Sequence, residues 1–349
     1  MGQTSQSEFR KNDMKITDAS AVTHRPTVTA VEIRTPEDAN AGTDLIDVQV
    51  TQLQASPQQI QRVVVSLKGG TVAFHSSNLR LRTRSSVRND LLAFVVFGRQ
   101  ASGTVAGFPV RPGLMLVVPP DTAVDFVVGE GWQSVALLIP PEAIGAYGEA
   151  GFRRPQAAEI LEADPEHIFG LFEWGKCLAE AAVQQPEVFN KPSAQLSAAE
   201  AELPERLAAV LAVASAYRPN RTDLKRRAQH RIVRIAEHVA MSRVGSGFYV
   251  KDMCDAAGVS ERTLEYAFRD VMGLSPVAFL IRLRLHRARQ ALLAADLETS
   301  TVTAIALHWG FGHLGEFARD YKACFGELPS ETLVQRRAEI PNPEVEVTP

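Results

Sequence analysis

Between residues 45 and 140, short runs rich in Val, Leu and Phe alternate with turn residues. The runs are separated by strong breakers, including Gly69-Gly70, Pro119-Pro120 and Gly129-Glu130-Gly131. Many short strands at regular spacing are typical of an antiparallel sandwich or barrel. We therefore expect a β-rich domain over residues 45–140.

The segments on either side of this region show different patterns. Residues 1–44 are polar and have no sustained period, so we expect a flexible arm with one short strand at VTAVEIRT. Residues 141–225 turn helical, and the Pro-containing segment 191–205 is interpreted as a linker within this helical arm. An apolar stripe then follows at Leu207, Val210 and Leu211. The stripe fits packing on its own domain or pairing with a second copy of the chain.

From residue 248 to residue 333 the same short pattern occurs twice. Each copy has a short amphipathic helix, a glycine, a second helix with two inward-facing residues, and then Gly-x-x-Pro. The first copy uses Gly258, Leu264, Phe268, Gly273 and Pro276, and the second uses Gly310, Phe317, Tyr321, Gly326 and Pro329. Glycine ends a helix in the left-handed conformation at little steric cost. Two short helices joined through such a turn form a helix-turn-helix unit.

The runs GVSERTL, in the first copy, and WGFGHLGEF, in the second, resemble the AraC/XylS transcription regulators. The second run is similar to the branch that includes the ethanolamine-utilisation regulator. This resemblance implies a multidomain α and β protein with an N-terminal antiparallel, cupin-like or jelly-roll-like sensor domain. It also implies an all-α DNA-binding domain, here residues 226–338, in which a long helix joins the two units. We expect the last residues, 339–349, to be disordered.

The resemblance implies a sequence-specific regulator of transcription that is more often an activator. Its expected partners are double-stranded DNA, a small-molecule effector of unknown identity and RNA polymerase, and a homodimer is one expected assembly. We expect no cofactor and a cytoplasmic, nucleoid-associated location, because no apolar run is long enough to span a membrane. Two alternatives stay open: an architectural DNA-binding protein without an effector, and a cupin-type enzyme with an accessory DNA-binding domain.

The outward faces of the second helix in each copy hold the candidate DNA-binding residues. Positions equivalent to Arg262 and Tyr266 read bases in the family, and Arg269 is expected at phosphate. Alternative roles are a solvated surface for Arg262, packing for Tyr266 and a turn position for His313. The full set is Ser260, Glu261, Arg262, Thr263, Glu265, Tyr266, Arg269, His313, Leu314, Glu316 and Arg319.

The charge distribution favours the same end of the chain. The formal net charge is -3, but residues 226–337 contain 16 Lys and Arg against 12 Asp and Glu. This segment is therefore near +4 and the rest near -7, and the positive sign suits phosphate contact. The three cysteines lie far apart and form no CxxC motif, so we expect neither a disulfide framework nor a zinc site.

The β-rich region offers candidates for effector binding. Arg80, Arg82 and Arg84 alternate along one strand and would share a face, where they could bind a carboxylate or phosphate. The alternative is a solvated outer face. Phe126 and Trp132 are candidate cavity walls or core residues. His75 is isolated among the strands, so no metal site of the cupin enzymes is expected.

Overall fold

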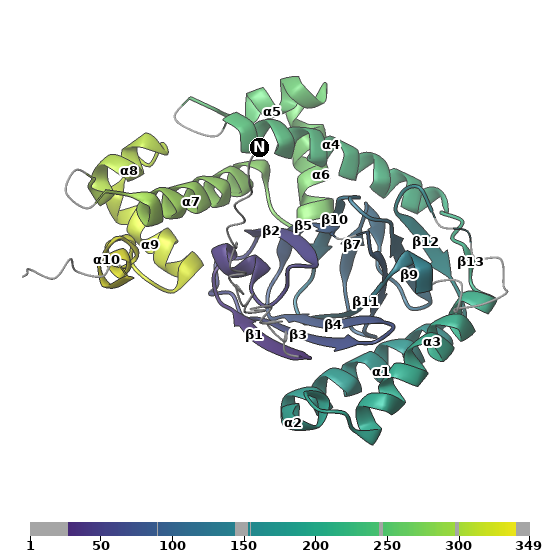
Figure 1. The fold of residues 1–349 in the computed structure, drawn as a ribbon. Helices are drawn as coiled ribbons and strands as arrows, with labels where there is room; N and C mark the ends of the chain where they lie inside the picture. Colours follow the sequence, from purple (N-terminus) through teal and green to yellow (C-terminus); the bar gives the residue numbers. More distant parts are fainter. Residues whose placement is uncertain are drawn as a thin grey trace, which may run out of the picture.

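The computed structural model describes residues 27–88, 90–143, 153, 155–243, 247–296 and 300–339. Along this part of the chain a β domain is followed by a helical arm and then by an all-helical domain (Figure 1). This order confirms the fold class predicted from the sequence. The tail at residues 340–349 and the first 26 residues of the expected arm lie outside the described residues.

Two antiparallel sheets form the β domain. In order across the first sheet, the strands are β1 (Val28–Ile33), β3 (Ile60–Leu67), β4 (Gly70–Ser77), β11 (Trp132–Ile139), β6 (Leu92–Phe97), β9 (Leu114–Val118), β12 (Glu159–Glu162) and β13 (Ser215–Ala216). The second sheet has the order β2 (Ile46–Gln52), β5 (Leu81–Val87), β10 (Val124–Val128), β7 (Gly103–Val105) and β8 (Phe108–Pro109). Alternate residues of each strand face opposite sides, so each sheet presents two distinct surfaces.

The first sheet has an apolar core on each face. In β4, Val72 and Phe74 point towards the helical arm, whereas Ala73 lies in the core between the two sheets. The helices α1 (Pro165–Gln184), α2 (Pro186–Phe189) and α3 (Ala194–Val213) cover the outer face, as Figure 1 shows below the sheet. The β domain is therefore a sandwich with a helical layer on one side.

The secondary structure of the segments flanking the sandwich differs in part from the structure expected from the sequence. Strand β1 pairs with β3, and a short 3-10 helix, η1 (Pro36–Asn40), packs on β2. The expected arm therefore ends before residue 44, and the strand predicted at VTAVEIRT is β1. Much of the predicted linker at 191–205 belongs to helix α3, which continues through Pro204 in its interior. Leu207 and Val210 of the apolar stripe are buried in the core beneath the first sheet.

The C-terminal domain is all-helical, and its helices from α5 onward correspond to the two repeats. The helices of the domain are α4 (Arg221–Arg243), α5 (Val250–Ala257), α6 (Glu261–Met272), α7 (Pro276–Ala294), α8 (Val302–His308), α9 (Leu314–Phe325) and α10 (Pro329–Glu339). In Figure 1, α4 and α6 lie over the sheet that contains β2, β5 and β10, on the side opposite the helical arm. None of the described helices is long and apolar enough to cross a membrane.

Candidate nucleic-acid interface

The first helix-turn-helix unit has the local geometry that its sequence predicts. Helix α5 ends at Gly258, whose φ of 64° lies in the left-handed region that favours glycine. Ser260 then caps α6, because its hydroxyl accepts a hydrogen bond from the backbone N–H of Thr263 at 3.3 Å. Leu264 and Phe268 of α6 are completely buried. The turn and the cap therefore fix the direction of α6 relative to α5.

The opposite face of α6 is open to solvent. Arg262 and Thr263 are exposed, and the Tyr266 side chain is 57% exposed. The amino group of Lys225 on α4 lies 5.6 Å from the centre of the Tyr266 ring. Tyr266 is therefore available at the surface rather than packed in a core. Lys225 was missed in the sequence because it belongs to a different helix.

Some candidate residues of α6 already have local partners. Arg269 Nε lies 2.6 Å from the Glu265 carboxylate in an exposed pair one turn apart. Exposed pairs of this kind contribute only about 0.3–0.5 kcal/mol, so Arg269 can exchange this partner for a phosphate at little cost. Glu261 is exposed in the first turn of the helix.

The second unit presents a similar but less polar face. Helix α9 begins after His313, which occupies the N-cap position without a side-chain cap hydrogen bond. Leu314 is 40% exposed, and Glu316 and Arg319 are exposed on the same helix. Arg319 Nε lies 3.3 Å from the Asp320 carboxylate in a surface pair.

Helix α7 joins the two units and contributes to both of their cores. Phe279 is buried in the first core, whereas Leu285 and Leu292 are buried in the second. Trp309 packs against both cores and so contributes to the contact between the two units. Arg284 Nη2 also donates to the Phe248 carbonyl oxygen at 2.7 Å. The two exposed faces are thus held on one continuous structural support.

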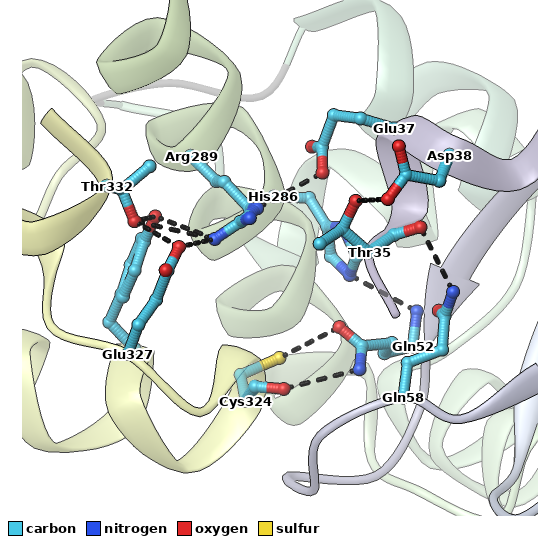
Figure 2. A network of polar contacts seen from close by, with 11 residues as sticks. Thr35, Glu37, Asp38, Gln52, Gln58, His286, Arg289, Cys324, Glu327 and Thr332 are labelled. Carbon is cyan, nitrogen blue, oxygen red and sulfur yellow. Dashed lines mark hydrogen bonds and ion pairs between the residues drawn. The ribbon is translucent and has the colours of Figure 1, made fainter. Parts of the chain in front are cut away.

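The second unit is bound to the β domain through the buried network in Figure 2. Arg289 of α7 is 3% exposed and pairs with Glu37 of η1 at 3.1 Å and with Glu327, which follows α9. The side-chain amide of Gln52 donates to the Cys324 carbonyl oxygen at 3.2 Å. The Gln52 backbone N–H donates to His286 Nε2 at 3.2 Å. Residues of η1 and β2 therefore contact α7 and α9 directly.

The first unit is bound to the second sheet through α4. Arg82 of β5 makes three hydrogen bonds to the Glu237 carboxylate, and the pair is nearly buried. Asp125 of β10 lies 3.2 Å from the same guanidinium. Burial alone would lower the pKa of Arg82, but the attraction of the two carboxylates outweighs it and raises the pKa. At the start of α4, Arg111 pairs with the buried Asp223 at 2.5 Å.

The predicted effector residues fall in different places. Arg82 and Arg84 line a cleft between the β domain and α4, and Arg80 lies near the carbonyl oxygen of Met272. Phe126 and Trp132 instead line a cavity between the two sheets. These assignments stay predictions. The cavity also contains Arg62, which the sequence analysis missed. The sequence did hold a signal, because Arg62 alternates with Ile60 and Val64 and therefore lies on the same inward face of the strand.

Comparisons with known proteins concern this C-terminal region. Residues 253–335 match a family of helix-turn-helix domains. The probable thc operon regulatory protein of Rhodococcus erythropolis is 39% identical over 102 residues, which cover 29% of this chain and 31% of that protein. The XylDLEGF operon transcriptional activator of Pseudomonas putida is 36% identical over 88 residues, covering 25% and 27%. Both matches therefore span less than a third of the relative's own length.

A solved structure matches 30% of the chain. The crystal structure of a probable AraC family transcriptional regulator from Rhodopseudomonas palustris CGA009 is 39% identical, with a TM-score of 0.28, and covers 30% of this chain and 96% of that one. The match to helix-turn-helix domains and the sequence identity to operon regulators agree with the two units in the structure. The C-terminal part of the chain thus contains a helix-turn-helix domain and is similar to operon regulators of the AraC/XylS type.

Proposed function

We propose that this protein is a sequence-specific DNA-binding regulator of transcription and that it acts as an activator rather than a repressor. The observation that carries the proposal is the pair of exposed polar faces, on α6 and α9, supported by the shared helix α7. An α-helix fits the major groove of DNA, where each base pair presents a distinct set of donors and acceptors. Successive major grooves on one side of the duplex are about 34 Å apart.

The proposal assigns different contacts to the two helices. On α6, Arg262, Thr263 and Tyr266 are available for bases or sugars, and Arg269 for phosphate. On α9, Leu314 can contact a thymine methyl group, and Arg319 is the best candidate for a polar base contact. Gly315 has no side chain, so we expect the second helix to discriminate between bases less than the first.

We further propose that the β domain receives a small-molecule signal. The second sheet has the cavity between the sheets on one face and the cleft towards α4 on the other. Val48 and Thr83 line the cavity between the sheets. Their neighbours Gln49 and Arg82 line the cleft towards α4. A ligand that moves β2 or β5 would therefore change the contacts that position the DNA-binding domain, which shifts a population of conformations.

Two further partners, RNA polymerase and a second copy of the chain, are proposed from the similarity to this family. An activator of this type would contact RNA polymerase. A homodimer would need a surface other than Leu207 and Val210, because both side chains are buried within one chain.

The experiment that tests the proposed function is selection of genomic fragments by the purified full-length protein. We expect a small set of enriched sites that share a sequence. Their affinity should exceed that for random DNA by about 10³-fold or more at physiological salt. Binding with a steep salt dependence but less than about a tenfold preference would instead indicate an architectural protein.

A further inference from the structure

The cavity between the two sheets is small and mostly apolar. Its volume is about 130 Å³, and its walls combine aliphatic side chains from both sheets with Phe126 and Trp132. For comparison, an apolar cavity of about 150 Å³ in a protein core can hold a molecule of benzene. The volume therefore suits a compact organic molecule of a few carbon atoms.

One wall of this cavity holds a buried cation. Arg62 of β3 is 3% exposed and lies on the same face of its strand as Ile60 and Val64. Its Nε donates to His75 Nε2 at 3.0 Å, and its Nη1 donates to the Ala41 carbonyl oxygen at 2.8 Å. Burial, and then the charge of Arg62, lower the pKa of His75 to about 3, so the imidazole is neutral. Both acceptors of the guanidinium are therefore uncharged.

Arg62 differs in this respect from two other buried arginines of the described chain. Arg82 is paired with Glu237 and Asp125, and Arg289 is paired with Glu37 and Glu327. The two carboxylates raise the pKa of Arg82 against the effect of burial, and Tyr321 together with the two carboxylates does the same for Arg289. Burial instead lowers the pKa of Arg62 to about 10.

An uncompensated buried charge is costly. Buried charges in proteins are normally paired, because removing an isolated ion from water carries a large free-energy penalty even after the surroundings relax. The Arg62 site is thus complementary to a negative charge that would enter from the cavity. The aliphatic walls, by contrast, offer no favourable environment for a strongly polar molecule.

We propose that the cavity binds a compact, mostly apolar carboxylate, whose anionic group pairs with Arg62 and whose apolar body fills the space between the sheets. This inference deepens the proposed function, because it names the chemical class of the effector. Arg62 also connects the ligand to the DNA-binding domain. It holds the carbonyl oxygen of Ala41, the residue that ends η1, and Glu37 of η1 pairs with Arg289.

The test compares carboxylates with their neutral amides on the full-length protein at neutral pH and without DNA. Suitable probes of increasing size are pentanoate, hexanoate and cyclohexanecarboxylate, each with its primary amide. Thermal shift and isothermal titration calorimetry would give their affinities. We expect at least one acid to bind tenfold or more tightly than its amide. Equal affinities of every pair, or no binding of any acid at millimolar concentration, would overturn the proposal.

Variants then assign the preference to Arg62. Arg62→Met should lower the affinity for the acid at least tenfold and remove its advantage over the amide, whereas Arg62→Lys should retain the advantage. Arg88→Met is a matched control, since the Arg88 side chain is 50% exposed and pairs with Asp47 at the surface. A preference that survives in Arg62→Met would contradict the assignment. If Arg62→Met does not fold, the acid and amide comparison in the wild type and in Arg62→Lys still decides.

The two proposals fail separately. Absence of acid binding with intact DNA recognition would remove the ligand class and leave the regulator. Acid binding without any sequence-specific DNA binding would leave the ligand site and remove the regulator.

Discussion

Arg82 Nη2 lies 2.7 Å from Glu237 Oε2, in a nearly buried ion pair that joins strand β5 to helix α4. The two residues are 155 positions apart in the chain, so the pair fixes one domain against the other. Removing one partner of a buried pair leaves an uncompensated charge and typically costs about 3–5 kcal/mol. The contact is therefore a sensitive point for testing how the β domain holds the first helix-turn-helix unit.

The first prediction concerns this contact. Glu237→Gln should weaken the docking of α4, so that the C-terminal domain unfolds at a lower temperature than the β domain. Differential scanning calorimetry should then resolve two transitions. Glu265→Gln, which breaks only an exposed pair on α6, is the matched control and should change little. A single unchanged transition in Glu237→Gln would mean that the pair does not couple the domains.

The second prediction concerns the network between η1 and α7. Arg289 depends on Glu37 for one of its two carboxylate partners, and the other, Glu327, belongs to the second unit. Glu37→Gln should therefore loosen the second unit and speed hydrogen exchange of the α9 backbone amides. Glu32→Gln is the control, because Glu32 pairs with Arg34 at the surface. Unaltered exchange in α9 would show that the remaining contacts of Gln52 are sufficient.

The third prediction concerns pH. Burial is the main cause that lowers the pKa of three histidines, to about 3 for His75 and His286 and to about 4 for His230. These folded-state values lie below the ordinary value of about 6.5, so the unfolded chain takes up protons first as the pH falls. Stability should thus be complete above neutral pH and decrease as the pH falls below about 6.5.

The expected loss is large for a protein of marginal stability. Each histidine should contribute about 2 kcal/mol of destabilisation between roughly pH 7 and pH 5, provided that its folded-state pKa stays below 5. Urea denaturation at several pH values would measure the slope. His286→Gln should reduce the slope by about one histidine's share, and His238→Gln, at an exposed position, should not. A flat profile would show that these side chains are not held neutral.

The fourth prediction concerns the turn of the first unit. Gly258 has a φ of 64°, and an added Cβ would meet no heavy atom within 4 Å. Gly258→Ala should therefore cost only the backbone strain of a left-handed residue, about 1–2 kcal/mol. Chemical denaturation would measure this cost. A loss well above this range would mean that the glycine also serves a close contact, and no loss would mean that the turn can rearrange.

Local patterns made the C-terminal domain predictable. Gly258, Gly273 and Gly326 all have positive φ at the ends of helices, and Ser260 and Ser275 cap the following helices. Each of these features depends on residues within one turn of each other. The short apolar strands of the β domain were likewise visible as local runs between breakers.

Contacts between distant segments were not predictable. Glu237 occupies a helix that is otherwise rich in charge, and only the packing of α4 on β5 makes it a buried partner of Arg82. Pro204 suggested a break, but packing of Leu203 and Leu207 holds α3 continuous around it. The role of Arg62 required knowing that two sheets enclose its side chain. The sequence contains these residues but not the pairing of segments that gives them their surroundings.

The most direct test of the central claim is a hydroxyl-radical footprint of the full-length protein on a selected site. We expect two protected segments about one helical turn apart on one face of the duplex. Arg262→Ala should weaken one segment and relax preference there by about 1–3 kcal/mol, and Arg319→Ala should act on the other. Uniform protection, or protection of a single segment that both variants affect equally, would contradict the claim that two helices of one chain enter neighbouring grooves.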